Sequence, residues 1–174
     1  YYNDTYGHEV GDLVLSTTGR LFRMHREGDT GVRWGGDEYL RIVRNLVTET
    51  QLGLIAGRDA ELVDSFAWEL LDVRLTEHPP RISIGLVYCE RPSREERARM
   101  VRRDAEVKIA TEQRFDAAVA VPLGSSFDIA RRLVALADQK MYEAKRAFAG
   151  SADPHLAQIN VRVSEGRLVE LGTL

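Results

Sequence analysis

The chain has 174 residues, of which 44% are hydrophobic and 29% are charged, with a net charge of −3. This is an ordinary globular composition in a length that suits one domain with a full core, and it argues against bulk attraction to nucleic acid or anionic membranes. The single cysteine, Cys89, excludes an internal disulfide and fits a reducing compartment. No apolar run in the sequence approaches membrane-spanning length.

The first half of the chain predicts a helix, a hairpin and a second helix. Residues 8–27 show helical periodicity, with one apolar face made by Val10, Leu13, Val14, Leu21 and Met24. Strands are expected over 32–34 and 39–47, joined across a Gly-Gly-Asp-Glu bend. Asp59 is expected to cap a helix over 60–75, whose buried side carries Leu62, Phe66 and Leu70.

The second half predicts a strand, a helix and a terminal hairpin. The β-rich strand covers 81–89, and packing is the expected role of its cysteine. The following Arg- and Glu-rich stretch favours either a solvated helix or an extended loop, and 117–122 suggests a short strand. Ser125 or Ser126 is expected to cap a helix over 127–148, and 158–171 reads as a hairpin about a Ser-Glu-Gly turn. Together these elements predict an α/β domain with a mostly antiparallel sheet covered by helices.

The bend in "RWGGDEYLRIV", residues 33–43, combines two glycines with two acids. Glycine permits positive φ and a close approach of a ligand, and Mg²⁺ commonly binds one or two carboxylates together with substrate phosphates. Successive side chains of a strand point to opposite faces, so Asp37 and Glu38 should have different roles. On its spacing alone, the bend favours a plain hairpin turn with solvated charges.

Four segments occur together that resemble the GGDEF family, the diguanylate cyclases. They are "NDTYGHEVGD" at 3–12, "RWGGDEY" at 33–39, "ISIGLV" at 82–87 and "ADQKMYEAK" at 137–145. The resemblance extends from residue 1 to about residue 148, with Tyr39 in place of the family's usual Phe. It implies a palm-like, ferredoxin-like α+β fold related to the class III nucleotide cyclases. The domain is expected over 1–150, with 151–174 as a hairpin extension of the same domain.

The resemblance also implies an activity. Family members condense two GTP molecules into cyclic di-GMP and pyrophosphate, using Mg²⁺ or Mn²⁺ and a homodimer in which each subunit holds one GTP. By this resemblance Asp37 is a catalytic metal ligand, and Glu38 is a second ligand or helps to deprotonate the 3′-hydroxyl. Gly35 and Gly36 should lie against the nucleotide.

Further residues are assigned to the nucleotide by the same resemblance. Asn3 and Asp12 should hydrogen-bond the guanine edge, Leu15 should pack on the base, and Lys145 should bind phosphate. The plain alternatives are helix capping for Asn3 and Asp12 and an exposed helix charge for Lys145.

Arg26 and Asp29 match the family's inhibitory RxxD motif, which binds the product cyclic di-GMP. As a bare pattern, RxxD is commonly a surface ion pair. The leading hypothesis is therefore a bacterial cytoplasmic cyclase domain with product inhibition. The alternatives are an inactive GGDEF module that senses GTP or cyclic di-GMP, and a dimerisation scaffold.

The sequence departs from the family at several places. The family's first strand, with a metal-binding Asp and a phosphate-binding Lys in Asp-x-Asp-x-Phe-Lys, would precede Tyr1, and it is central in the family's sheet. The usual Gly-Arg-Asn after Lys145 is replaced by "RAFAGSAD". The stretch 90–116 is longer than the usual link and is interpreted as a solvated insertion or a partner surface. An upstream sensory domain is also expected.

Overall fold

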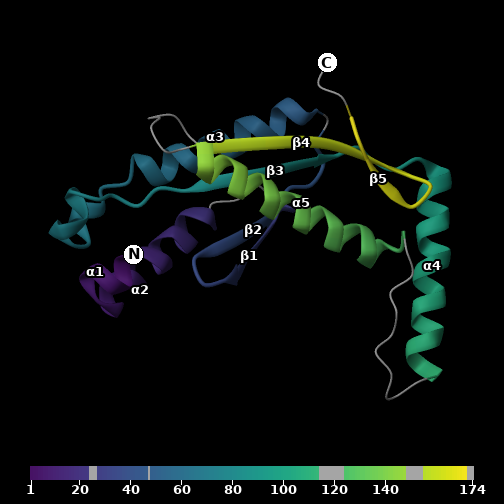
Figure 1. The fold of residues 1–174 in the computed structure, drawn as a ribbon, viewed down its shortest axis with the longest axis horizontal. Coiled ribbons are helices and arrows are strands. Elements are labelled where there is room, and N and C mark those ends of the chain that lie inside the picture. Colours follow the sequence, from purple (N-terminus) through teal and green to yellow (C-terminus); the bar gives the residue numbers. More distant parts are fainter. Residues whose placement is uncertain (24–26, 47, 114–123, 148–154, 172–174) are drawn as a thin grey trace. The chain divides into compact units, whose positions relative to one another are not determined.

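The computed structural model describes residues 1–23, 27–46, 48–113, 124–147 and 155–171, with only the backbone for 106–113 and 155 (Figure 1). These residues form two compact units, one built mainly from Tyr1–Ser83 and the other mainly from Ile84 onward.

Helices make up most of the first unit. They are α1 (Tyr2–Tyr6), α2 (His8–Phe22), α3 (Glu49–Asp64) and the short 3₁₀ helices η1 (Trp68–Leu70) and η2 (Val73–Thr76). The hydrophobic core of this unit contains Val10, Val14, Val63, Trp68 and Leu75. The indole of Trp68 donates a hydrogen bond to the Val63 carbonyl at 2.9 Å, which satisfies its buried polar atom. The apolar face predicted for 8–27 is confirmed at Val10 and Val14, whereas Leu13 is 41% exposed and Met24 lies outside the described residues.

The helix predicted over 60–75 is wrong in both its start and its extent. Helix α3 begins at Glu49, where the Thr48 hydroxyl accepts a hydrogen bond from the Gln51 amide at 3.4 Å, and it ends at Asp64. Asp59 lies inside α3 and caps nothing, and Leu70 is 82% exposed. The true buried face includes two alanines, and such small residues give only a weak periodic signal. It consists of Leu52, Ala56, Ala60 and Val63.

An antiparallel hairpin completes the first unit. Strand β1 covers Thr30–Gly35 and β2 covers Glu38–Ile42, with Gly35 opposite Glu38 and a register shift between Arg33 and Gly35. The predicted hairpin across the Gly-Gly-Asp-Glu bend is confirmed. Its second strand ends at Ile42, earlier than the sequence indicated.

The second unit contains a sheet of β3, β4 and β5 in that order, together with two helices. Its elements are β3 (Ser83–Cys89), α4 (Arg94–Gln113), α5 (Ser126–Ala147), β4 (His155–Ser164) and β5 (Arg167–Glu170). Strands β4 and β5 are antiparallel, as expected for the terminal hairpin, whereas β3 and β4 run in the same direction (Figure 1). The predicted α/β class with a mostly antiparallel sheet flanked by helices is confirmed.

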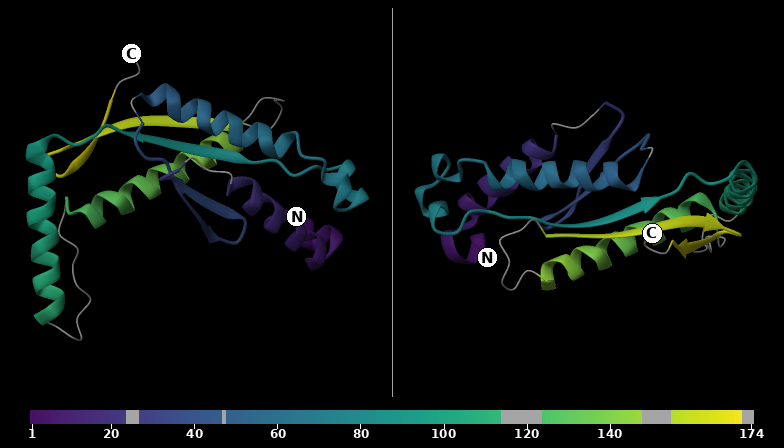
Figure 2. Two further views of the ribbon diagram at one scale, coloured as in Figure 1. Left: turned by 180° about the vertical axis from the view of Figure 1, so that it is seen from behind. Right: turned by 90° about the horizontal axis from the view of Figure 1, so that it is seen from above.

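Helix α5 lies along the β3–β4 part of this sheet (Figure 2). A Cβ atom built on Gly85 of β3 would overlap the backbone of Ala137 and Met141, so the missing side chain permits this close packing. The hydroxyl of Ser125 accepts a hydrogen bond from the Asp128 amide at 3.2 Å, which confirms one of the two predicted caps. The short strand predicted over 117–122 lies outside the described residues.

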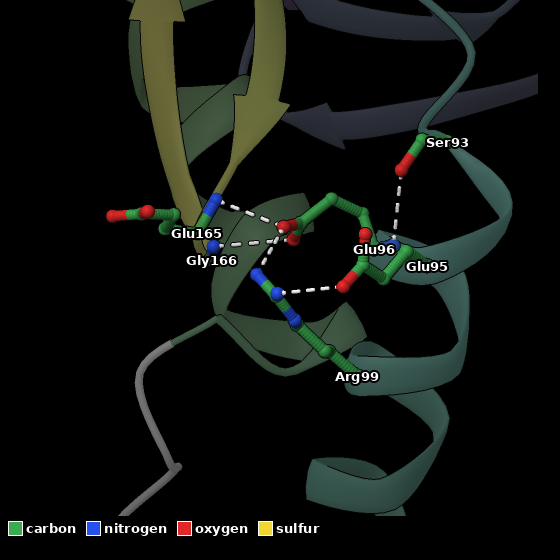
Figure 3. Close-up of polar contacts among 6 residues, drawn as sticks. All are labelled: Ser93, Glu95, Glu96, Arg99, Glu165 and Gly166. Atoms are coloured by element: carbon green, nitrogen blue, oxygen red, sulfur yellow. Dashed lines mark hydrogen bonds and ion pairs between the residues drawn. The ribbon is translucent and has the colours of Figure 1, made fainter.

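Helix α4 is held to the β4–β5 turn by a buried carboxylate. Glu96, which is 7% exposed, accepts hydrogen bonds from the amides of Glu165 at 3.0 Å and Gly166 at 3.3 Å (Figure 3). Both turn residues have positive φ, 50° and 72°, a conformation that directs neighbouring amides toward one anion. Arg99 pairs with Glu96 at 2.9 Å. For the Arg- and Glu-rich stretch the sequence left a helix and an extended loop open, and the helix is correct. One side of this helix is attached to the β4–β5 turn through Glu96.

Candidate nucleotide and metal site

The Gly36-Asp37 pair forms the exposed turn between β1 and β2. Gly36 has φ of 49°, and a Cβ on Gly35 or Gly36 would meet nothing within 4 Å, so a ligand has access to this backbone. The guanidinium of Arg33 donates to the Gly36 carbonyl from Nε at 3.0 Å and from Nη2 at 2.6 Å. The turn is therefore braced from one side and open to solvent on the other.

The two acids of the turn differ in their surroundings. Asp37 is exposed, whereas Glu38 is the first residue of β2 and is partly buried. The different surroundings follow from strand alternation, and the expectation that the two carboxylates have different roles stays a prediction.

Tyr39 attaches this turn to helix α2. Its hydroxyl donates a hydrogen bond to the Leu15 carbonyl at 2.7 Å, and its ring meets Phe22 edge-on with 5.3 Å between centroids. The ring also lies beside Gly19, where an added Cβ would make only an ordinary contact with Tyr39 Cε1, at 3.6 Å. Burial raises the pKa of the Tyr39 hydroxyl above its ordinary value, so the hydroxyl stays protonated and donates near neutral pH. From the sequence, Tyr39 is only a mild aromatic exchange for the family's usual Phe. The structure shows that its hydroxyl anchors the turn to α2.

Helices α1 and α2 carry the three residues expected to recognise guanine. Asn3 and Asp12 are exposed, and Leu15 is partly buried. No side chain caps the N-terminus of α1 or α2, so capping does not account for Asn3 or Asp12. The side chain of Asn3 lies against Gly11, where an added Cβ would overlap it. The plain alternative for these two residues is therefore not supported by the fold.

Through Tyr39, the first unit connects the acidic turn to the helix that carries Asp12 and Leu15. Lys145 belongs to the second unit, where it is exposed in the last turn of α5. Its assignment to phosphate stays a prediction.

The aspartate of the RxxD motif has internal partners. Its side chain is 1% exposed, and it accepts hydrogen bonds from Arg41 Nη2 at 2.9 Å and from the Arg44 amide at 3.2 Å. Arg41 also binds Asp59 of α3, with Nη1 at 2.8 Å and 2.5 Å from the two carboxylate oxygens. We call Asp29, Arg41 and Asp59 the Arg41 bridge. Arg26 lies outside the described residues.

The carboxylates of the turn limit what kind of metal site is possible. Within the described residues, no group of three or more His, Cys, Asp or Glu side chains is placed to hold a metal ion. Asp37 and Glu38 thus do not make a closed protein cage. They fit an ion such as Mg²⁺ that keeps water ligands and shares one or two carboxylates with substrate phosphates.

Comparison with known families gives a match to residues 1–117 by the family described as diguanylate cyclase, GGDEF domain. This match covers more than half of the chain. The chain belongs to the GGDEF family. The acidic turn of this GGDEF domain is thus the part of the chain that corresponds to the motif after which the family is named.

Curated relatives of this GGDEF domain are diguanylate cyclases. Diguanylate cyclase A of Treponema denticola is 41% identical over 44 residues, which are 25% of this chain and 12% of that protein. Diguanylate cyclase DgcM of Escherichia coli K12 is 40% identical over 55 residues, 31% of this chain and 13% of that protein. Diguanylate cyclase DgcZ of the same organism is 38% identical over 66 residues, 37% of this chain and 22% of that protein. The match thus spans less than a quarter of each of these relatives.

No solved structure matches the chain. In the part of the chain that the structure describes, no helix is both long and apolar enough to cross a membrane.

Proposed function

We propose that this GGDEF domain is the catalytic domain of a bacterial diguanylate cyclase, which condenses two GTP molecules into cyclic di-GMP and pyrophosphate. The observation that supports this most is the bond from Tyr39 to Leu15, which attaches the acidic turn to the helix that carries Asp12. Metal-binding acids and base-binding groups thereby belong to one compact unit. Phosphoryl transfer depends on such positioning more than on covalent chemistry.

In this proposal the exposed carboxylate of Asp37 binds Mg²⁺ or Mn²⁺, and Glu38 is a second ligand or accepts the proton of the 3′-hydroxyl. An ion held there would supply neutralisation of the charge that develops on the phosphates during transfer. Gly35 and Gly36 leave the backbone open, so that the triphosphate can lie against it. Lys145 binds a phosphate.

Guanine is recognised from α1 and α2. The amide of Asn3 can pair with a ring acceptor, and the carboxylate of Asp12 can accept from N1–H and the exocyclic amine. Adenine lacks these donors in the same positions, so GTP is preferred over ATP. Leu15 packs on the base. Each subunit of a homodimer holds one GTP. The 3′-hydroxyl of each GTP attacks the α-phosphate of the other GTP.

Regulation and context belong to the same proposal. Arg26 and Asp29 bind cyclic di-GMP and inhibit the enzyme. We place the domain in the cytoplasm behind an upstream sensory segment, in keeping with the single cysteine. We assign 1–150 to the GGDEF domain and 151–174 to an extension of the same domain. The position of β4 beside β3 in one sheet supports including the extension in this domain.

One observation favours a second candidate, an inactive GGDEF module that binds GTP or cyclic di-GMP. Among the described residues, no third potential ligand lies with Asp37 and Glu38. A domain that only senses a nucleotide has less need of a complete metal site.

The test is turnover of GTP by the natural full-length protein, stripped of bound nucleotide, with Mg²⁺ or Mn²⁺. We expect cyclic di-GMP to form, as detected by mass spectrometry, and Asp37→Ala to abolish it. Asp64→Ala removes an exposed carboxylate on α3 and should leave turnover unchanged. If a dimeric wild-type protein makes no product but binds GTP or cyclic di-GMP in calorimetry, the sensor module is correct and the enzyme proposal fails.

A further inference from the structure

The Arg41 bridge lies at the residue to which product inhibition is assigned. The side chain of Asp29 is 1% exposed, and those of Arg41 and Asp59 are each 16% exposed. Both carboxylate oxygens of Asp29 have partners, Oδ2 with Arg41 Nη2 and Oδ1 with the Arg44 amide. A guanine or phosphate group therefore cannot reach Asp29 in this arrangement.

The alternation of β2 explains how an arginine comes to this position. Tyr39 and Arg41 lie two residues apart and share one face of the strand, and Tyr39 on that face contacts α2. Arg41 on the same face reaches Asp59 of α3. Its planar fork binds one carboxylate through each terminal nitrogen, which a lysine could not do.

We propose that the Arg41 bridge competes with cyclic di-GMP for Asp29, so that the product binds this aspartate only after it has left Arg41. This inference rests on the proposed inhibitory role of Arg26 and Asp29. A ligand that binds a minor conformation has its apparent affinity reduced by the fraction of protein in that conformation. The bridge thereby raises the product concentration at which inhibition begins.

The geometry keeps the open state accessible. When Asp29 leaves, Arg41 Nη1 retains both oxygens of Asp59, so the guanidinium is not left without a charged partner. The bonds that opening breaks include the charged hydrogen bond from Nη2 and the amide bond from Arg44. Bonds of this kind correspond to a weakening of roughly ten- to a hundredfold in apparent affinity.

The test is calorimetry of cyclic di-GMP binding to the natural full-length protein after removal of bound nucleotide. The variant Arg41→Leu with Asp59→Leu removes the bridge at constant net charge and keeps the Asp29 carboxylate, now without Arg41 as a partner. We expect it to bind cyclic di-GMP about tenfold or more tightly than the wild type, and Asp29→Asn to remove this gain. The double variant Arg102→Leu with Asp64→Leu removes the same charges from exposed side chains away from Asp29 and should bind as the wild type does.

Arg41→Lys keeps the charge but loses the fork, so it should give an intermediate gain in affinity for cyclic di-GMP. It serves as the test if the apolar double variant does not fold. Wild-type affinity in both bridge variants would overturn the proposal. Weaker binding in them would also overturn it and would make Arg41 itself a ligand contact. Binding by none of the proteins would refute Asp29 as a ligand group, whereas the turnover assay reports separately on the enzyme.

Discussion

Replacing Tyr39 with Phe removes one hydroxyl group from the contact between the acidic turn and α2. The lost bond is a neutral one of 2.7 Å in a partly buried place, and a typical bond of this kind contributes about 0.5–1.5 kcal/mol net. Leu15 lies inside α2, so its carbonyl keeps the helical amide as a partner and is not left unsatisfied. We therefore expect Tyr39→Phe to lower the free energy of unfolding by about 1 kcal/mol.

Tyr39→Ala also removes the ring that meets Phe22, which should bring the total loss to about 3 kcal/mol. In urea, with an m-value of about 2 kcal/mol/M, the two variants should shift the unfolding midpoint by about 0.5 M and about 1.5 M. Tyr142→Phe, at a side chain that is 51% exposed, serves as the control without a shift. An unchanged midpoint for Tyr39→Phe, or equal midpoints for the Phe and Ala variants, would refute the assigned anchor.

Three further outcomes can be measured by unfolding. Gly85→Ala should cost about 3 kcal/mol or more, because its Cβ would overlap backbone atoms of α5 that cannot rotate away, whereas Gly57→Ala, in open space on α3, should gain about 0.5–1 kcal/mol. Ser125→Ala should cost about 1 kcal/mol through the lost cap, and Ser126→Ala much less; equal costs would contradict the assigned cap. Burial, with the neighbouring tyrosines, raises the pKa of Tyr2 from 10.0 to about 12, so its contribution to stability is complete below pH 10 and is lost as pH rises toward 12. The urea midpoint should therefore fall less between pH 9 and 11 in Tyr2→Phe than in the wild type.

The parts of the fold that the sequence predicts well are those with strong local signals. The β1–β2 hairpin follows from glycines between two β-prone runs, and the terminal hairpin follows from alternation about a Glu-Gly turn. Helix α3 is mispredicted, since alanine contributes little to a periodic pattern and Asp59 resembles a cap. Its carboxylate is bound by Arg41 instead, a partner 18 residues away.

The candidate site is predictable in its residue types and not in its connections. The acidic turn is evident from Gly35 to Glu38, and motif resemblance adds Asn3, Asp12 and Leu15. The bonds from Tyr39 to Leu15 and from Arg41 to Asp29 and Asp59 join segments that are distant in sequence. No local pattern specifies such pairs, because they depend on which strand face meets which helix.

The carboxylate of Glu96 joins parts of the chain that lie on either side of the end of the family match. The family match stops at residue 117, yet the two amides that Glu96 binds belong to residues 165 and 166. A protein cut at that boundary would leave Glu96 without its two amide donors, with Arg99 as its remaining partner, and β3 without its neighbour β4. The segment matched by the family is therefore shorter than the segment that packs together in the structure. We expect α4 and the β4–β5 hairpin to be kept or lost together in evolution.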